Sequence, residues 1–138
     1  MVGMNKPIEG GCLCGAVRYV LESRPNYVYF CHCRDCQLES GSPFVTDMNV
    51  DRIALRISGQ MTRYTRKGES GKAVHRNFCT TCGSTLLTEF DVDPTHVSIK
   101  ACSLDDPSRV EPDRHLFTSR MQPWLGLDDR RTRYERDC

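Results

Sequence analysis

Short runs of β-branched, aromatic and alternating apolar residues recur along the chain, separated by glycine, proline and charged residues. Such runs are typical of β-strands, because a pleated, half-buried surface favours these side chains at alternate positions. No long amphipathic helix interrupts them, so the pattern predicts a mainly β fold. The expected strands cover residues 16–21, 27–30, 44–48, 53–57, 61–65, 73–78, 85–88, 95–101 and 115–117.

The middle of the chain is expected to contain a hairpin. Apolar residues at alternate positions of 53–57 indicate a half-buried strand that ends at Gly59, and residues 61–65 are its expected partner. Residues 66–72 contain two glycines among charged side chains, so we expect an exposed loop there.

Three further segments are expected to be short or irregular. The two glycines at 10–11 should loosen the backbone ahead of the first cysteine pair, and residues 37–40 should form one helical turn that stops at Gly41. Residues 128–133 are nearly all charged and should lie on the surface or fray.

Length and charge narrow the class of protein. With 138 residues the chain has about the size of one domain, and we expect a single domain over residues 1–138. A hydrophobic fraction of 38% together with nine cysteines suggests that metal or cross-links add stability. The net charge of +1 supplies no field that would attract nucleic acid or an anionic membrane, so we expect neither as a partner.

The expected cellular compartment decides whether the cysteines bind metal or form disulfides. No apolar run approaches the ~20 residues of a membrane span, and residues 1–9 lack the apolar segment of a signal peptide. We therefore expect a cytoplasmic protein. Stable disulfides are uncommon in that reducing compartment, so cysteines at CxC and CxxC spacing are expected to hold metal and not to pair with each other.

Seven cysteines fall in three clusters, and the glycines that follow two of them divide the seven into four and three. Cys12-Leu13-Cys14 and Cys79-Thr80-Thr81-Cys82 are each followed by a glycine, which can take the positive φ that curls a backbone around a metal. We predict one closed zinc site that joins segments about sixty-five residues apart. The expected ligands of this structural zinc are Cys12, Cys14, Cys79 and Cys82.

Cys31, Cys33 and Cys36 remain, at the end of a predicted strand and with no glycine after the last of them. Three thiolates leave Zn²⁺ with a net charge of −1 and one free coordination position, which suits a small thiol bound as thiolate. This triple is therefore the expected catalytic zinc site, and making or breaking a carbon–sulfur bond is the expected chemistry. The alternative, that His32, Cys102 or a shifted cysteine completes a second closed site, stays open at this point.

The histidines are weaker candidates. The side chain of His32 should point away from the ligands on either side of it. His115 is either an acid or base near the site or an ordinary hydrogen-bonded histidine. His75 and His96 look like strand histidines without a partner.

The remaining thiols and several basic residues complete the candidates. Cys102 is expected to be a small buried hydrophobic residue and Cys138 a loose terminal thiol. Some basic residues could meet the carboxylates of an anionic substrate, although solvated surface charge explains each of them as well. These residues are Arg34, Arg63, Arg66, Lys67 and Arg76.

The motifs and their order closely resemble the glutathione-dependent formaldehyde-activating enzyme family, which includes the centromere protein V type domain. The likeness runs over about residues 9–134. The matching pieces are Gly11-Cys12-Leu13-Cys14-Gly15, Cys31-His32-Cys33-Arg34-Asp35-Cys36-Gln37, Gly41-Ser42-Pro43-Phe44, Arg76-Asn77-Phe78-Cys79-Thr80-Thr81-Cys82-Gly83-Ser84, Leu104-Asp105-Asp106, His115-Leu116-Phe117 and Pro123-Trp124.

The resemblance implies an Mss4-like zinc-binding β fold with two zinc ions per chain, one structural and one catalytic. It also implies the family's founding activity, the condensation of formaldehyde with glutathione to S-hydroxymethylglutathione. On this reading the protein is a zinc-dependent carbon–sulfur lyase, glutathione is a co-substrate, and the partner is a small-molecule thiol adduct. The alternative function is a non-enzymatic zinc module that binds a protein or nucleic-acid partner, as the centromere branch of the family implies.

Overall fold

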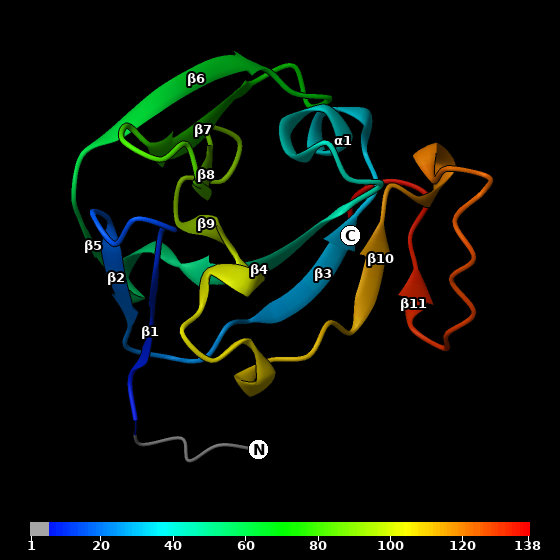
Figure 1. The fold of residues 1–138 in the computed structure, drawn as a ribbon. Helices are drawn as coiled ribbons and strands as arrows, with labels where there is room; N and C mark the ends of the chain where they lie inside the picture. Colours follow the sequence, from blue (N-terminus) through cyan, green and yellow to red (C-terminus); the bar gives the residue numbers. More distant parts are fainter. Residues whose placement is uncertain (1–5) are drawn as a thin grey trace.

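The computed structural model describes residues 6–138, which form two β-sheets and one short α-helix (Figure 1). The smaller sheet is antiparallel with the order β1-β2-β5, formed by β1 (Ile8–Gly11), β2 (Arg18–Leu21) and β5 (Leu55–Ser58). The larger sheet has the order β11-β10-β3-β4-β9-β8-β7-β6, and β10 runs parallel to both of its neighbours. Its strands are β3 (Tyr27–Cys31), β4 (Val45–Asp51), β6 (Met61–Lys67), β7 (Ala73–Cys79), β8 (Thr85–Phe90), β9 (His96–Lys100), β10 (Arg114–Leu116) and β11 (Thr132–Arg133).

The two faces of the larger sheet pack against different partners, because successive side chains of a strand point to opposite faces. One face joins the smaller sheet in the main hydrophobic core, to which β4 and β9 contribute Met48, Val50, Val97 and Ile99. On the other face, the ends of β3 and β10 and the start of β4 form a second cluster with the helix. This cluster contains Tyr29, Cys31, Cys36, Val45 and Leu116.

Helix α1 (Arg34–Ser40) covers this second cluster and begins directly after Cys33. The Cys33 sulfur accepts a hydrogen bond from the backbone N–H of Cys36, as the side chain of an ordinary capping residue does. Gly41 ends the helix with a φ of +69°, as predicted. The helix is longer than the turn expected at 37–40, because the sulfur supplies a cap that sequence rules assign to serine, threonine or aspartate. Among residues 6–138, no helix is long and apolar enough to cross a membrane.

The prediction of a mainly β fold is confirmed, and every expected strand overlaps an observed one. The hairpin prediction is wrong, because β5 pairs with β2 whereas β6 pairs with β7 in the other sheet. Ile53 is 91% exposed in a 3-10 turn, Arg52–Ala54, and not part of a strand. The turn at Gly59 therefore carries the chain from one sheet to the other instead of closing a hairpin.

Two smaller predictions also need correction. Residues 10–11 belong to β1 and are not a loosened segment, since their backbone pairs with β2. Strand β6 extends to Lys67, which shortens the loop expected at 66–72. The charged stretch at 128–133 lies largely on the surface, as expected, and within it residues 132–133 form β11 and pair with β10.

Gly59 is a position where substitution should lower stability. Its φ is +111°, and a Cβ there would lie 2.3 Å from the backbone oxygen of Ala16 and 2.7 Å from Val17 Cα. Because alanine would combine a strained backbone with a clash, we expect Gly59→Ala to lower the free energy of unfolding by about 3 kcal/mol. Urea unfolding followed by circular dichroism measures the loss. Gly126→Ala is the control, since a Cβ there meets nothing within 4 Å; equal losses in the two variants would contradict the argument.

Candidate functional site

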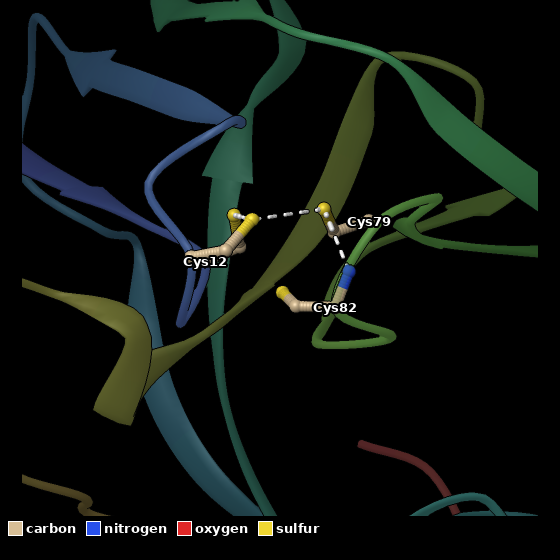
Figure 2. Close-up of side chains that lie close together, drawn as sticks. Cys12, Cys79 and Cys82 are labelled. Carbon is tan, nitrogen blue, oxygen red and sulfur yellow. Dashed lines mark hydrogen bonds between the residues drawn. The ribbon is translucent and has the colours of Figure 1, made fainter.

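Four cysteine sulfurs link a turn of the smaller sheet to a turn of the larger one. Cys12 and Cys14 follow β1, Cys79 ends β7, and Cys82 lies in the turn before β8. Their Sγ atoms all lie within 4.8 Å of one another, and 3.8 Å separates those of Cys14 and Cys79. Figure 2 shows the side chains of Cys12, Cys79 and Cys82 gathered around a common centre.

Hydrogen-bond donors in both turns point at these sulfurs. The backbone N–H of Val17 donates to Cys12 Sγ at 3.2 Å, and that of Cys82 donates to Cys79 Sγ at 3.5 Å. The Ser84 hydroxyl lies 3.2 Å from Cys82 Sγ. Hydrogen bonds from the Ser84 side chain and backbone lower the pKa of the Cys82 thiol to about 5. This environment favours the thiolate form of Cys82, which is the form that metals bind.

The donor set fits a closed zinc site. Tetrahedral coordination with a Zn–S distance of about 2.3 Å places sulfurs about 3.8 Å apart, which agrees with the separation of Cys14 and Cys79. Gly15 and Gly83 have φ values of +82° and +78°, so the expected positive φ is confirmed at both. That the four cysteines bind a structural zinc stays a prediction.

Three further sulfurs gather where β3 meets α1. Cys31 ends the strand, Cys33 caps the helix and Cys36 lies in its first turn, with all three Sγ atoms within 4.8 Å of one another. Hydrogen bonds from Cys31 and Cys36 lower the pKa of the Cys33 thiol, and the Arg76 guanidinium adds a smaller effect. The same hydrogen bonds raise the pKa of Cys31 and Cys36. The cluster therefore stabilises negative charge first on Cys33.

Within residues 6–138, no fourth histidine, cysteine, aspartate or glutamate joins this group at the same distance. His32 bonds to another histidine, and Cys102 is exposed in the 3-10 turn Ala101–Ser103 and belongs to neither cluster. The three sulfurs therefore fit a metal that keeps one coordination position for another ligand. The identity of that metal stays a prediction.

A buried chain of histidines supports the loop that carries these cysteines. His32 Nε2 lies 2.9 Å from His115 Nδ1, and His115 Nε2 lies 3.1 Å from both carboxylate oxygens of Asp129. Both rings are fully buried, and burial lowers the pKa of His32 to about 4. Phe30 stacks on His115 with ring centroids 5.0 Å apart. His32 thus points away from the sulfurs, as predicted, and His115 is a hydrogen-bonded histidine that positions it.

A cavity of about 790 Å³ opens beside the three sulfurs, and Cys31, Cys33 and Cys36 form part of its wall. Much of the remaining wall is the polar face of the larger sheet. Several of these polar side chains are buried, although polar residues are normally exposed. Buried polar groups around a cavity are the arrangement expected of a site for a polar small molecule. On this face lie Tyr29, Asp47, Asn49, Thr88 and Ser98.

Two carboxylates and two cations form a buried ionic network at this cavity. Lys100 Nζ lies 3.0 Å from Asp47 Oδ1 and 3.3 Å from Glu39 Oε1, and Arg76 Nε lies 3.4 Å from Glu39 Oε2. None of the four side chains is more than 14% exposed. Burial disfavours the charged form of Lys100, but the nearby charges of Asp47 and Glu39 outweigh it and raise the pKa of the ammonium group. The ammonium group of Lys100 therefore stays charged at neutral pH.

Removing the cation at the centre of this network should be costly. Lys100→Met leaves Asp47 and Glu39 buried with less compensation, and we expect a loss of about 3 kcal/mol in the free energy of unfolding at pH 7. Because the pKa of Lys100 is raised, its contribution is fully present below the unfolded-state value and is lost only as pH rises through the folded-state value. Urea unfolding measures the effect. Lys67→Met, at an exposed position, should change stability by less than about 0.5 kcal/mol, and a similar loss there would contradict the prediction.

The structure divides the five candidate basic residues into two that line the cavity and three that lie on an exposed strand. Arg34 and Arg76 line the cavity beside the three sulfurs. Arg63, Arg66 and Lys67 lie on β6, where their side chains are exposed, and the two arginines pair with carboxylates of this chain. These three are surface charges.

The prediction that His75 and His96 lack partners is wrong. His75 Nε2 lies 2.8 Å from Asp91, and His96 Nδ1 lies 2.8 Å from Asp93. Both aspartates follow the end of β8, in the turn that leads to β9. The contact of His75 depends on how the chain turns back after β8, whereas His96 and Asp93 are only three residues apart in the sequence.

The two thiols outside the clusters are both exposed. The prediction of a buried Cys102 is wrong, because the chain leaves β9 in a 3-10 turn that directs this residue to solvent. Cys138 is exposed at the end of the chain, as expected, with its sulfur 3.7 Å from Arg114 Nη1.

Several residues that line the cavity or bond to its lining were not identified from the sequence. Glu39, Asp47 and Lys100 read as ordinary surface charges, although Asp47 falls where a buried apolar residue is expected in an alternating strand. In the sequence, Gln37 stands out only as part of the cysteine motif and of the helical turn expected at 37–40. Its amide donates to the backbone oxygens of His32 and Arg120, at 2.8 and 3.0 Å. Gln37 thus connects α1 to a 3-10 turn eighty-three positions away.

Fold and site together define a mainly β protein with two cysteine clusters, each arranged so that it could hold a metal ion. The sequence model of the family described as glutathione-dependent formaldehyde-activating enzyme matches residues 7–120, a range that contains both clusters. The chain belongs to this family.

The individual relatives share less than 30% sequence identity with this chain. A protein of Halomonas elongata named "Putative glutathione-dependent formaldehyde-activating enzyme" is 27% identical over 135 residues, which cover 89% of this chain and 82% of that protein. An uncharacterized lyase of Schizosaccharomyces pombe is 28% identical over 78 residues, 56% of this chain and 54% of that protein. A solved structure of a Rhodobacter sphaeroides protein has a TM-score of 0.58 at 20% identity, covering 73% of this chain and 93% of that one. This last likeness concerns the fold alone.

Proposed function

We propose that this protein is a zinc-dependent carbon–sulfur lyase that acts on the adduct of formaldehyde with glutathione or another small thiol. The observation that carries the proposal is the group formed by Cys31, Cys33 and Cys36. These three sulfurs lie in the wall of a cavity, and no fourth protein ligand joins them among residues 6–138. A closed four-ligand site would leave no position for a substrate sulfur.

The reaction needs a group that stabilises sulfur as a leaving group. In the cleavage direction the C–S bond breaks and its electron pair goes to sulfur, while the hydroxyl of the adduct gives its proton to water and becomes the carbonyl of formaldehyde. A zinc ion held by Cys31, Cys33 and Cys36 would supply a Lewis-acidic position that favours the thiolate form of the substrate sulfur in either direction of the reaction.

The two cysteine clusters would have different roles, one catalytic and one structural. Cys31, Cys33 and Cys36 would hold the catalytic ion, and the positive charge of Arg76 favours the thiolate form of Cys33. The other four cysteines would hold a structural ion that fixes the two sheets relative to each other. The buried polar face of the larger sheet is suited to a polar, hydrogen-bonding substrate.

Exchange spectroscopy tests the proposal directly. In a mixture of ¹³C-formaldehyde and glutathione, the zinc-loaded protein should accelerate exchange between hydrated formaldehyde and S-hydroxymethylglutathione in proportion to protein concentration. NMR measures the exchange rate, with the metal-free protein as control. If the protein carries two zinc ions and the rate equals that in buffer, the proposed activity is wrong.

A further inference from the structure

Residues 121–138 lie beyond the range that the family's sequence model matches, yet one of their side chains contacts the buried histidines next to the three sulfurs. This side chain is Asp129, whose two carboxylate oxygens each lie 3.1 Å from His115 Nε2. The backbone N–H and the guanidinium group of Arg131 donate to the same carboxylate at 3.1 and 3.2 Å. Asp129 is therefore held in place by its own segment while it contacts a fully buried ring of β10.

The carboxylate sets the direction of the hydrogen bonds between the two histidines. An ionised carboxylate can only accept, so His115 donates its Nε2 proton to Asp129. In a neutral His115 ring Nδ1 is then the acceptor, and it accepts from His32 Nε2–H, 2.9 Å away. A doubly protonated His115 would instead donate to His32 and leave a proton on His32 Nδ1, which is buried and has no hydrogen-bond partner among residues 6–138. Because a buried N–H without an acceptor is rare in proteins, Asp129 fixes the tautomers of both rings.

His32 is fixed on three sides, and the two cysteines beside it are fixed with it. Its backbone N–H donates to the backbone oxygen of Leu116 at 3.0 Å, its carbonyl oxygen accepts from the Gln37 amide at 2.8 Å, and its ring is held by the hydrogen bond just described. Cys31 ends β3 and Cys33 has an extended backbone, and successive side chains of an extended chain point to opposite sides. Anchoring the His32 ring on the buried side therefore directs the sulfurs of Cys31 and Cys33 to the other side, where the cavity lies.

We propose that Asp129 and His115 are positioning residues for the three-sulfur site. Through the ring of His32 they hold the cysteine loop in the arrangement that binds metal. Thiolates of this group repel one another when no metal is bound, so a loop without this support would move its sulfurs apart, and metal binding would then also have to order the loop. Partners that orient metal ligands typically contribute about 10- to 100-fold to metal affinity. The inference rests on the proposed function only in that the three sulfurs hold zinc, and it does not depend on the reaction.

Competition with a chromogenic zinc chelator tests the proposal without measuring activity. The zinc that the loaded protein retains is measured at rising chelator concentration. The difference from Cys33→Ser, which lacks the three-sulfur site, gives the zinc affinity of that site. In Asp129→Ala we expect this affinity to fall about 10- to 100-fold, while the affinity of the four-cysteine site stays unchanged.

Two further variants separate positioning from a general loss of stability. Asp129→Asn keeps an oxygen that can accept from His115 Nε2, so its three-sulfur site should bind zinc within about threefold of the wild type. Asp128→Ala is the matched control, because it removes the neighbouring carboxylate at an exposed position, and it should bind zinc like the wild type. Circular dichroism should show the same fold in all three variants.

Several outcomes would overturn the proposal. These are wild-type affinity of the three-sulfur site in Asp129→Ala, an equal loss at both zinc sites, or an equal loss in Asp129→Asn or Asp128→Ala. A wild type that retains no more zinc than Cys33→Ser would refute both this proposal and the proposed function. Selective loss of affinity in Asp129→Ala, together with a wild type that does not accelerate adduct exchange, would instead refute the lyase activity and leave the positioning role standing.

Discussion

Replacing Cys79 with serine should abolish cooperative folding. Cys79 is fully buried in the main core, and its sulfur belongs to the four-cysteine group. Structural zinc contributes about 10 to 16 kcal/mol of apparent binding free energy in zinc-finger peptides, which is as large as the whole stability of a typical domain. The site also closes a loop of about sixty-five residues, so its loss releases much chain entropy in addition to losing zinc binding.

Far-UV circular dichroism, thermal unfolding and elemental analysis of zinc measure this effect. Cys102→Ser is the matched control, because Cys102 is exposed and belongs to neither cluster. It should keep two zinc ions per chain and the wild-type melting temperature. If Cys79→Ser melts cooperatively at the wild-type temperature, the four-cysteine group does not support the fold.

Replacing Cys33 with serine should leave the fold intact and remove the activity. We expect the protein to stay folded with one zinc ion in place of two, and adduct exchange to fall at least about 1,000-fold, because the Lewis-acidic site supplies several kcal/mol of stabilisation. The fold should survive because Cys31, Cys33 and Cys36 lie within six residues of one another, so a metal there closes only a short loop. The substitution changes no residue of the two sheets or of the four-cysteine group.

Zinc analysis, circular dichroism and the exchange assay measure the three parts of this prediction on one sample. Cys138→Ser is the control, since its exposed sulfur lies outside both clusters, and it should retain full activity. Retention of both zinc ions by Cys33→Ser would contradict the open three-sulfur site. Loss of zinc with undiminished exchange would show that the metal at this site takes no part in the reaction.

The strands were predictable because the period of two in apolar residues is a local property. Residues 95–101 carry apolar side chains at alternate positions, and the strand is observed with nearly the expected bounds. Strand pairing was less predictable. The segments before and after Gly59 look like a hairpin in sequence, but they join different sheets because each finds a longer-range partner.

The grouping of the cysteines was also predictable, for a covalent reason. CxC, CxxC and a following glycine restrict how far apart the sulfurs can lie, so the spacing within Cys31–Cys36 almost fixes a local cluster. That Cys12 meets Cys79 is not local, and it was inferred only from glycines with the same role in two turns. The structure brings all four sulfurs together as expected.

The sequence by itself determined the mainly β character, the two sets of cysteines and the family, because these depend on short-range spacing and order. Only the tertiary structure decided what surrounds the three-sulfur group. Asp47 faces Lys100 because of the register between β4 and β9, and Arg120 lies beside α1 because the buried amide of Gln37 bonds to its backbone. Register and long-range hydrogen bonds follow from the packing of the whole chain, so no local pattern could have revealed the cavity or its charges.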